Sequence, residues 1–564
     1  MRADDWIIDY LVKKGVTDVF GIPGVVVMDF LYAVDRRKPE ITPHLSYHEQ
    51  GGAFAACGYA QATGKVGVAY GTRGPGMTNM ITAIADAYYD STPTMFFTAH
   101  SSPELEENMR VLNNQEIDTV SLVKNVTKMA VRIDSLEDLQ REVMGAYHLA
   151  STGRRGPVFL DILSSLFGKE VEEAEDPIAD LTASKASAAA AAVEIRNRIK
   201  AARCPVLLVG SGTRYGAAPA LIRQVAAKFG IPILSSRTAQ DVVPDSAEYF
   251  GFVGSRATRY SNFILSKADL IIALGNRMAF PTQSKSFRPV VENAFTIRVD
   301  VDGSEFTRPV PNSIGFTADV SDVLAELVNS DLHYENAQAW LDICRELKQT
   351  LNRWDEIPVI SRIMGIIEAS DPGSALVCDV GNHSFWVTSA HAYCGRPNRI
   401  LYSGSFGTLG CALPKAIGAC YSTGHPSVCF VGDQGLQMNI QELQFISANR
   451  LPMTIVVLNN RSSGMIMERE KAKHGDYFVH TTLDSGYSYP DYEAIAKAYK
   501  IDYRRVNAMD LREPLDVTLG KAPLMLELMV DEDTALNPNL PQGNACQDLA
   551  PALPKDLYDR LNNL

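Results

Sequence analysis

Short apolar runs of strand length alternate along the chain with longer stretches whose apolar residues recur at helical spacing. Examples of the short runs are "PVLLVGSG" at 205–212 and "ADLIIALG" at 268–275, and each ends in glycine. Strands that alternate with helices predict parallel sheets covered by helices on both faces. The alternation occurs in three blocks, so the sequence predicts an α/β protein with three doubly wound parallel-sheet domains.

The boundaries between the blocks are expected where the pattern breaks. The first block closes on the strand "GPVFLDIL", and an acidic, then alanine-rich segment follows it and leads into a helix. The chain becomes rich in Pro and Asn after Asp533, which is typical of a tail on a surface. The expected division is a first domain at 1–168, a linker at 169–190, a middle domain at 191–335, a helical linker at 336–357, a third domain at 358–540 and a tail at 541–564.

Composition narrows the class of protein. The chain has 564 residues, of which 46% are hydrophobic and 21% charged, with a formal net charge of −13. Nucleic-acid binding relies on clustered Lys and Arg, so this acidic balance predicts no nucleic-acid partner. No apolar run approaches the roughly 18 residues of a membrane span, and the N-terminal stretch reads as an amphipathic helix and a strand rather than a leader. The nine cysteines form no CxxC pair, which is typical of reduced thiols in a cytoplasmic protein.

Polar residues follow two apolar runs in the third block. "SVCFVGDQG" breaks at Gly432 and places Asp433 at a strand end, and "MTIVVLNN" ends in Asn459 and Asn460 at the same edge of a parallel sheet. Carboxylate, amide and loop carbonyl oxygens suit a Mg²⁺ ion that bridges phosphates. Alternatively, Asp433 only caps the following helix and the Asn pair forms a turn. The occurrence of both motifs at strand ends favours the metal site.

These two motifs, "GDQ" and "NN", resemble the diphosphate-binding motif of thiamine-diphosphate (ThDP) enzymes. "YHEQGGAFAACGYAQATG" is similar to the family's cofactor-activating glutamate segment, and "GTRGPGMTNMITAIADAYYDSTP" to its Gly-Pro-Gly loop and following helix. "CDVGNHSFW", "SGSFGTLGCALPKAIGA" and "MNIQEL" resemble the acetolactate-synthase branch most closely. The landmarks cover nearly the full chain, so the chain is identified as a member of the acetolactate synthase and 2-oxo acid decarboxylase family.

The resemblance implies cofactor roles for individual residues. Glu49 would contact N1′ of the aminopyrimidine and help to activate the cofactor; read alone, it could be a first-turn acid favoured by the helix dipole. Leu409 would support the bent cofactor, a position that an ordinary core leucine could also occupy. Asp433, Asn460 and the carbonyl of Ser462 would bind Mg²⁺. The other expected cofactor contacts are Gly381, Asn382, His383, Gly407, Gly432, Gln434, Gly435, Gly464, Met465 and Ile466.

The middle block resembles the domain that carries FAD in the acetolactate-synthase branch, through "GSG", "ALGNRM" and "VDVDGSEF". The resemblance therefore implies FAD as a possible cofactor and the chain as a flavoprotein, although such Gly and Asp positions also occur in middle domains that have lost the nucleotide. FAD is expected at the carboxyl edges of the strands, where glycine permits close approach of the backbone and an acid can meet a ribose. The expected contacts are Gly210, Gly212, Arg277 and Asp300.

Three positions depart from the acetolactate-synthase pattern. Asn114 precedes Gln115 where the resemblance leads us to expect Phe-Gln, His100 stands in place of Gln, and Arg469 in "GMIMERE" stands in place of a Trp that selects a small acceptor. Gln115 and His100 are expected at the catalytic centre, and Asn114 and Arg469 in the substrate pocket. The changes predict a more polar pocket, although Arg469 could equally be a surface charge.

The predicted function is a carboligase that decarboxylates a 2-oxo acid such as pyruvate and transfers the fragment to an acceptor carbonyl. The polar pocket suggests an acceptor larger than pyruvate, such as a keto sugar. A simple decarboxylase that releases an aldehyde is the alternative, because Glu468 follows the "NN" motif closely. A non-catalytic regulatory chain is disfavoured by the presence of Glu49, Asp433 and Asn460. The family further implies a homodimer or homotetramer with the active site between chains.

Overall fold

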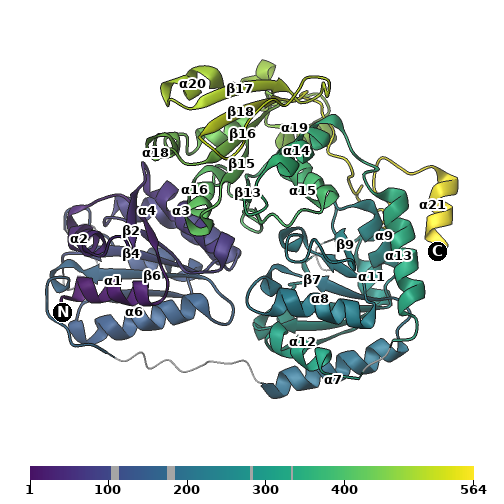
Figure 1. The fold of residues 1–564 in the computed structure, drawn as a ribbon, viewed down its shortest axis with the longest axis horizontal. Helices are drawn as coiled ribbons and strands as arrows, with labels where there is room; N and C mark the ends of the chain where they lie inside the picture. Colours follow the sequence, from purple (N-terminus) through teal and green to yellow (C-terminus); the bar gives the residue numbers. More distant parts are fainter. Residues whose placement is uncertain (103–112, 175–184, 280–283, 332–333) are drawn as a thin grey trace. The chain divides into compact units, whose positions relative to one another are not determined.

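The computed structural model describes residues 1–102, 113–174, 185–279, 284–331 and 334–564. It contains three six-stranded sheets in which every strand pair is parallel, and helices flank each sheet (Figure 1). The predicted fold class is therefore confirmed. The chain forms two compact units, one of 1–181, 370–384 and 398–532 and one of 182–369, 385–397 and 533–564. Among the described residues no helix is long and apolar enough to cross a membrane.

The first sheet belongs to the first unit and has the strand order β2-β1-β3-β4-β6-β5. Its central strands β3, β4 and β6 are mostly apolar and are buried at every position, as expected for a parallel sheet covered on both faces. The strands are β1 (Asp18–Gly21), β2 (Thr42–Leu45), β3 (Gly67–Tyr70), β4 (Thr94–His100), β5 (Met129–Ile133) and β6 (Pro157–Leu163). The helices are α1 (Ala3–Lys13), α2 (Met28–Arg36), α3 (Glu49–Thr63), α4 (Pro75–Tyr89), α5 (Thr119–Val123) and α6 (Leu136–Ser151).

The third sheet also belongs to the first unit and has the order β14-β13-β15-β16-β18-β17. Its strands are β13 (Ala375–Cys378), β14 (Ile400–Leu401), β15 (Ser427–Gly432), β16 (Met453–Asn459), β17 (Asp502–Asn507) and β18 (Leu524–Met529). The accompanying helices are α15 (Asn382–Cys394), which begins in this unit, α16 (Ala412–Thr423), α17 (Asp433–Gln437), α18 (Glu442–Ala448), α19 (Gly464–His474) and α20 (Tyr492–Ala498). Because β13, β15 and β16 are neighbours, the loops after them emerge side by side at one edge.

Helices α3 and α16 join the two sheets of the first unit and lie side by side (Figure 1). A Cβ atom on Gly418 would lie 1.8 Å from the carbonyl oxygen of Ala55, and one on Gly58 would lie 2.0 Å from that of Lys415. Glycine at these two positions allows the backbones to approach this closely. The apolar core continues through the contact between the two domains.

The second unit contains the middle sheet, with the order β12-β11-β10-β7-β8-β9. Its strands are β7 (Pro205–Val209), β8 (Ile233–Ser235), β9 (Tyr249–Phe252), β10 (Leu270–Leu274), β11 (Phe295–Asp300) and β12 (Ser313–Thr317). Its helices are α7 (Lys185–Ala201), α8 (Ala218–Phe229), α9 (Arg259–Lys267), α11 (Arg288–Asn293), α12 (Val320–Val328), α13 (Ala337–Leu351) and α14 (Pro358–Ala369).

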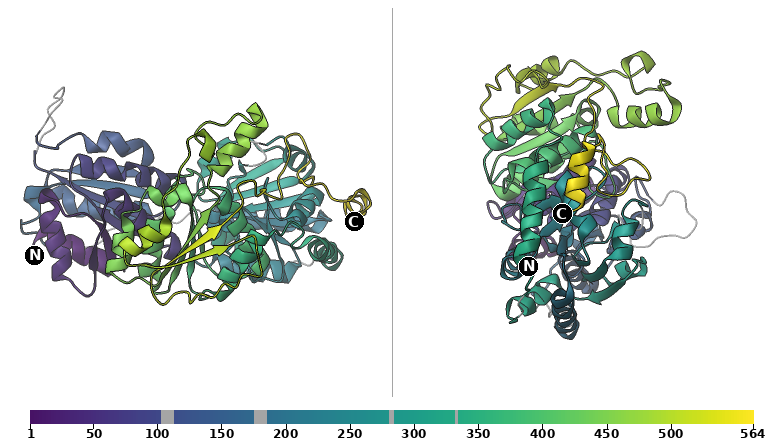
Figure 2. Two further views of the ribbon diagram at one scale, coloured as in Figure 1. Left: turned by 90° about the horizontal axis from the view of Figure 1, so that it is seen from above. Right: turned by 90° about the vertical axis from the view of Figure 1, so that its right-hand side faces the viewer.

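The C-terminal segment packs on the second unit. Buried Arg259 donates to the carbonyls of Leu549 and Pro551 at 2.9 and 2.7 Å and pairs with Asp355 at 2.7 Å. The segment ends in helix α21 (Lys555–Asn562), yellow in Figures 1 and 2, where the Tyr558 ring lies 5.7 Å from that of Phe263 on α9. This part of the chain is therefore fixed to the middle domain by specific buried contacts.

Candidate active site

Asp433 lies at the carboxyl edge of the third sheet, as the first residue of α17. The side chain is buried, and burial raises the pKa of Asp433 to about 6. Its carboxylate accepts hydrogen bonds from the backbone N–H of Gln434 at 2.9 Å and of Arg461 at 3.0 Å. One carboxylate therefore joins the loop after β15 to the loop after β16, the two segments that the sequence predicts for the metal.

The two asparagines of the "NN" motif point to different places. Asn459 donates to Glu527 Oε1 at 2.7 Å inside the sheet, whereas Asn460 donates to Ser462 Oγ at 2.8 Å in the loop. A Cβ on Gly464 would lie 2.7 Å from Asn460 Nδ2 and 3.0 Å from Asn382 Nδ2, so the loops after β13 and β16 also meet here. Asn459 Oδ1 also accepts from the backbone N–H of Arg461 at 3.1 Å, so Asn460 is the member of the pair whose side-chain amide lies wholly in the loop.

Two buried polar atoms near this meeting point lack a partner among the described residues. They are Asn382 Oδ1 and His383 Nε2. Burial lowers the pKa of His383 to about 4, so its ring is neutral at pH 7. Gly381 has φ +152, and a Cβ there would lie 2.8 Å from the His383 ring, which only glycine avoids. Unpaired buried polar atoms beside a carboxylate fit a polar ligand such as a metal-bound diphosphate.

The described residues contain no cluster of three or more His, Cys, Asp or Glu side chains of the kind that holds a metal by itself. The predicted magnesium ligands are of another kind, with one carboxylate, one amide and one backbone carbonyl. Mg²⁺ accepts so few protein ligands when phosphate oxygens and water complete its shell. The donor set of Asp433, Asn460 and Ser462 therefore fits a magnesium diphosphate.

The loop that carries Leu409 is held by two carboxylates that the sequence analysis did not identify. Buried Asp379, after β13, accepts from the backbone N–H of Gly410 at 2.8 Å and of Ala412 at 2.9 Å. Asp90, after α4, accepts from the backbone N–H of Gly404 at 2.7 Å and Ser405 at 2.8 Å. Leu409 itself is half-buried. The segment expected to support the cofactor is thus fixed from both domains of the unit.

The remaining expected contacts of the third domain lie on the same loops. Gly407, with φ +74, is exposed two residues before Leu409. Glu468 Oε1 lies 3.3 Å from Asn382 Nδ2, so the first turns of α19 stand beside the loop after β13. The other expected residues of this edge are Gly432 and Gly435 around Asp433, half-buried Met465, and exposed Ile466 and Arg469 on α19.

A second group of predicted residues gathers in the first domain. Glu49 is the first residue of α3, and its Oε2 accepts a hydrogen bond from Asn79 Nδ2 on α4 at 2.9 Å. A Cβ atom on Gly76 would lie 3.4 Å from Glu49 Oε1. A Cβ atom on Gly74 would lie 2.2 Å from the carbonyl oxygen of Gln115. The structure thus brings both Glu49 and Gln115 against the Gly-Pro-Gly loop. Asn114 and Gln115 are exposed, and residues 103–112 before them lie outside the described chain.

His100 occupies a different environment from Gln115. It is the last residue of β4 and is 1% exposed. Its Nε2 lies 2.8 Å from Asp134 Oδ1 and its Nδ1 3.2 Å from Asp161 Oδ1. Both ring nitrogens thus lie beside carboxylates of the first domain, and Nε2 is hydrogen-bonded to Asp134. A catalytic role for His100 stays a prediction.

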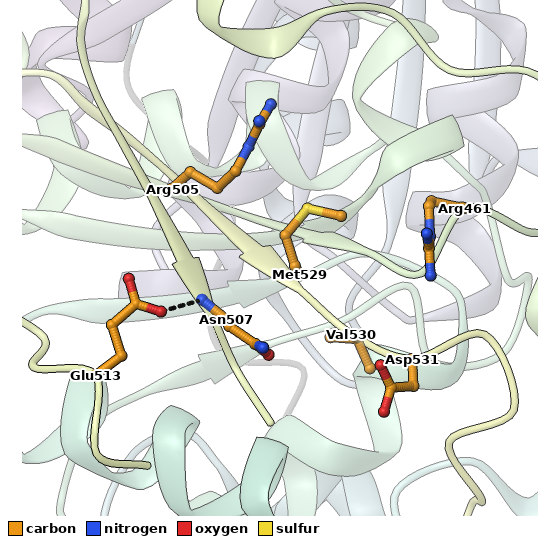
Figure 3. Close-up of a pocket in the computed structure, with 7 residues that line it drawn as sticks. All are labelled: Arg461, Arg505, Asn507, Glu513, Met529, Val530 and Asp531. Carbon is orange, nitrogen blue, oxygen red and sulfur yellow. Dashed lines mark hydrogen bonds between the residues drawn. The ribbon is translucent and has the colours of Figure 1, made fainter. Parts of the chain in front are cut away.

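A cavity of about 400 Å³ opens beside the loop of Asn460 and Ser462 (Figure 3). It lies at the carboxyl ends of β17 and β18, and in Figure 3 the Glu513 carboxylate meets the backbone nitrogen of Asn507, at 2.8 Å. The residues that line it are Arg461, Arg505, Asn507, Glu513, Met529, Val530 and Asp531. Arg461, with φ +60, belongs both to this cavity and to the loop bonded to Asp433.

Three family models match the chain in order along its length. The N-terminal TPP-binding domain of thiamine pyrophosphate enzymes matches residues 1–122, the central domain 192–327 and the C-terminal TPP-binding domain 379–527. The acetolactate synthase large subunit of Lactococcus lactis subsp. lactis is 30% identical over 95% of this chain and 94% of its own length. The chain belongs to the thiamine pyrophosphate enzymes, in their acetolactate synthase family. The large subunit of Escherichia coli acetolactate synthase isozyme 1 is 30% identical over 96% of both chains, and acetolactate synthase 1 of Oryza sativa subsp. japonica is 31% identical over 97% of this chain and 87% of its own length.

These matches confirm the predicted family and the prediction of a ThDP-dependent enzyme of the carboligase and lyase type. They also support ThDP, together with Mg²⁺, as the cofactor of this thiamine pyrophosphate enzyme. The loops after β13, β15 and β16, which contain Asp433 and Asn460, lie within the match to the C-terminal TPP-binding domain. Glu49 and the Gly-Pro-Gly loop lie within the match to the N-terminal one.

The expectation of a flavoprotein is wrong on these comparisons, because all three matched models describe thiamine pyrophosphate enzymes and the central one carries no flavin description. The structure explains the misleading glycines. A Cβ on Gly210 would lie 2.1 Å from the carbonyl oxygen of Gly275. A Cβ on Gly212 would lie 3.1 Å from the Cα of Gly275. The loops after β7 and β10 pack on each other here. Asp300 accepts from the backbone N–H of Asp302, and Arg277 is half-buried on the loop after β10.

Proposed function

We propose that this enzyme is a Mg²⁺-dependent carboligase that acts on pyruvate or a similar 2-oxo acid. The C1–C2 bond of the donor breaks and CO₂ leaves, while the electron pair remains on C2. That carbon then bonds to the carbonyl carbon of the acceptor, whose oxygen takes up a proton. The observation that carries the proposal is the carboxylate of Asp433 joining two predicted metal loops beside the unpaired polar atoms of Asn382 and His383.

The residues of the third domain would bind the cofactor, and Glu49 of the first domain would handle the proton. Bound ThDP supplies the carbon nucleophile and the electron sink for decarboxylation. Asp433, Asn460 and the carbonyl of Ser462 would hold Mg²⁺, and His383 would donate from Nε2 to a diphosphate oxygen. Asn382 would lie beside this group, with its Nδ2 directed to Glu468. Glu49, oriented by Asn79, holds a proton at the aminopyrimidine nitrogen. On this assignment residues 1–168 bind the pyrimidine and residues 358–540 the diphosphate, with the middle domain at 191–335 between the linkers.

We propose a homodimer, or a dimer of dimers, with the active site between chains. Glu49 of one subunit would serve a cofactor held by Asp433 of the other. In support, Glu49 and Asp433 belong to separate clusters in the single chain, one on the Gly-Pro-Gly loop and one at the edge of the third sheet. Mixed Glu49→Gln and Asp433→Ala subunits should then regain part of the activity, because one site of the heterodimer is intact. A fully active monomer in solution contradicts this arrangement.

We propose further that the acceptor is bulkier and more polar than pyruvate, with a keto sugar or its nucleotide-linked form as the leading candidate. The support is chemical: Arg469 on α19 and Asn114 beside Gln115 are both exposed polar side chains at positions where the family pattern has aromatic residues. Where the bound acceptor excludes water from these donors, a small apolar acceptor would leave them unpaired. The acetolactate synthase relatives give no support to the alternative of an aldehyde-releasing decarboxylase.

Competition between acceptors tests this proposal. The holoenzyme is given pyruvate as donor with a panel of keto sugars, aldehydes and 2-oxo acids, and kcat/KM is measured for each acceptor. We expect a polar acceptor to exceed pyruvate and Arg469→Trp to shift the preference toward pyruvate. If pyruvate self-condensation matches every polar acceptor and Arg469→Trp leaves the preference unchanged, the enzyme is an acetolactate-forming one and the polar-acceptor proposal fails.

A further inference from the structure

Glu442 is a buried carboxylate of the third domain that contacts the segment carrying Glu49 in the first. It is the first residue of α18, lies in the "MNIQEL" segment and is 1% exposed. Its Oε1 accepts hydrogen bonds from the backbone N–H of Tyr47 at 3.1 Å and of His48 at 3.2 Å. These are the two residues that precede Glu49, so the contact spans the boundary between the two domains of the first unit.

The first turn of α3 is shaped to admit this carboxylate. A Cβ on Gly51 would lie 2.3 Å from Glu442 Oε1 and 2.7 Å from its Cδ, so a larger residue at position 51 displaces the side chain. His48 caps the same turn from the other side, because its Nδ1 accepts from the backbone N–H of Gln50 at 3.1 Å. The backbone on both sides of Glu49 is therefore fixed by side-chain acceptors.

The Glu442 carboxyl is desolvated where it meets the backbone of Tyr47 and His48. Burial raises the pKa of Glu442 to about 7, while the N–H groups of Tyr47 and His48 act in the opposite direction. The Glu442 carboxyl can accept both hydrogen bonds whether or not it is ionised, and a buried N–H left without an acceptor is costly. Removing the acceptor at position 442 therefore releases two backbone donors next to Glu49.

We propose that Glu442 is a positioning residue that sets the direction in which the Glu49 carboxylate leaves the start of α3. The inference rests on the proposed role of Glu49 as the group that activates the cofactor. On this proposal the third domain, which is expected to bind the diphosphate, also fixes the backbone before Glu49 through Glu442. A displacement of about 1 Å at such a group is enough to cost on the order of 100-fold in rate.

Two substitutions at position 442 separate the acceptor from the charge. Glu442→Gln keeps a side-chain oxygen for both N–H groups, whereas Glu442→Met keeps only the length. Hydrogen exchange of the Tyr47 and His48 amides is measured in the protein without cofactor. We expect Glu442→Met to speed exchange at both amides by about 10-fold or more, since one lost hydrogen bond corresponds to about that factor, and Glu442→Gln to stay within about 3-fold.

Turnover with the loaded enzyme provides the second measurement. We expect Glu442→Met to lower kcat by about 10- to 100-fold with the KM of the donor nearly unchanged, and Glu442→Gln to retain most of kcat. Gly51→Ala should reproduce the effect of Glu442→Met, because its Cβ displaces the same carboxylate. Gly145→Ala is the matched control: Gly145 lies inside helix α6, and a Cβ there meets no atom within 4 Å.

The outcomes are distinct. Unchanged exchange at Tyr47 and His48 in Glu442→Met, or faster exchange with kcat unchanged, overturns the positioning role. Loss of kcat in Glu442→Gln equal to that in Glu442→Met also overturns it, because the acceptor is retained there. If the wild-type protein shows no ThDP-dependent turnover, the proposed function fails, and the amide exchange still decides whether Glu442 holds the loop.

Discussion

Lys415 Nζ lies 2.6 Å from Asp86 Oδ2, and neither side chain is exposed to solvent. Lys415 belongs to α16 of the third domain and Asp86 to α4 of the first, so the pair crosses the contact between them. Asp86 also accepts from the hydroxyls of Ser403 and Thr408, on the loop that carries Leu409. One buried ion pair therefore ties the cofactor loop to the other domain.

Breaking this pair should strongly destabilise the first unit. Lys415→Met leaves the Asp86 carboxylate buried without its cation, which typically costs about 3–5 kcal/mol. The measurement is chemical unfolding of the protein without cofactor. As a control, Glu292→Gln removes the exposed partner of Arg288 and should cost at most about 1 kcal/mol. Equal losses in the two variants contradict a structural role for the buried pair.

Because α3 and α16 cross closely, we expect a larger residue at position 418 to lower the free energy of unfolding. In Gly418→Ala the new Cβ would overlap the Ala55 carbonyl, so the helices must separate, and we expect a loss of about 1–3 kcal/mol or more. Gly145→Ala, in open space on α6, should instead be neutral or gain up to about 1 kcal/mol from better helix propensity. A Gly418→Ala protein as stable as the wild type would show that the helices cross less closely.

The raised pKa of Glu442 predicts a pH dependence of stability. The carboxyl titrates at about 7 in the folded protein against an ordinary value of 4.5, so the folded state holds the proton more tightly. The stabilisation this gives is present below pH 4.5 and is lost as the pH rises to about 7. Glu442→Gln removes the titration, so relative to wild type it should gain on the order of 1–3 kcal/mol between pH 5 and pH 8.

This comparison isolates Glu442 because the other titratable groups of the facing segment, Tyr47, His48 and Glu49, are the same in both proteins. The midpoint of thermal unfolding is followed at each pH without cofactor. A difference between the two proteins that stays constant from pH 5 to pH 8 contradicts the shifted titration.

The predicted cofactor roles of Asp433 and Glu49 should separate into binding and turnover. Asp433→Ala removes the charged metal ligand, so Mg²⁺-dependent ThDP binding measured by calorimetry should be abolished. Glu49→Gln should bind ThDP but lose about 100-fold or more in kcat, because an amide does not exchange a proton with the pyrimidine. Tight ThDP binding by Asp433→Ala, or near-normal turnover by Glu49→Gln, removes that residue from its role.

The residues that could be predicted from the sequence are those that sit at the ends of apolar runs. Asp433 and Asn460 follow strands directly, so local pattern alone brings them to one edge of a parallel sheet. Glu442 could not be assigned in this way, since the backbone that it binds at Tyr47 is 395 residues away in sequence. Asp86 was missed for the same reason, because its partner Lys415 belongs to the other domain. Asp379 binds the backbone of Gly410 and Ala412 in its own domain, but these residues are also distant in sequence.

The mistaken expectation of a flavoprotein has a different physical cause. Glycine permits close approach to a nucleotide and to another loop equally well, so Gly210 and Gly212 have the same sequence signature in both cases. Only the position of Gly275 shows that the neighbour is protein backbone. His100 illustrates a related limit, because the two carboxylates that enclose it come from Asp134 and Asp161, on other strands and loops.

Product analysis with labelled pyruvate decides whether this enzyme is a ThDP-dependent carboligase. The enzyme is incubated with ThDP, Mg²⁺ and pyruvate labelled with ¹³C at C2, with and without a polar acceptor, and the products are identified by mass spectrometry and NMR. We expect release of unlabelled CO₂ and a product in which the labelled carbon has a new bond to the acceptor carbon. The Glu49→Gln enzyme should form this product far more slowly. Labelled acetaldehyde as the sole product, or consumption of pyruvate that does not require ThDP, would contradict the proposed carboligase function.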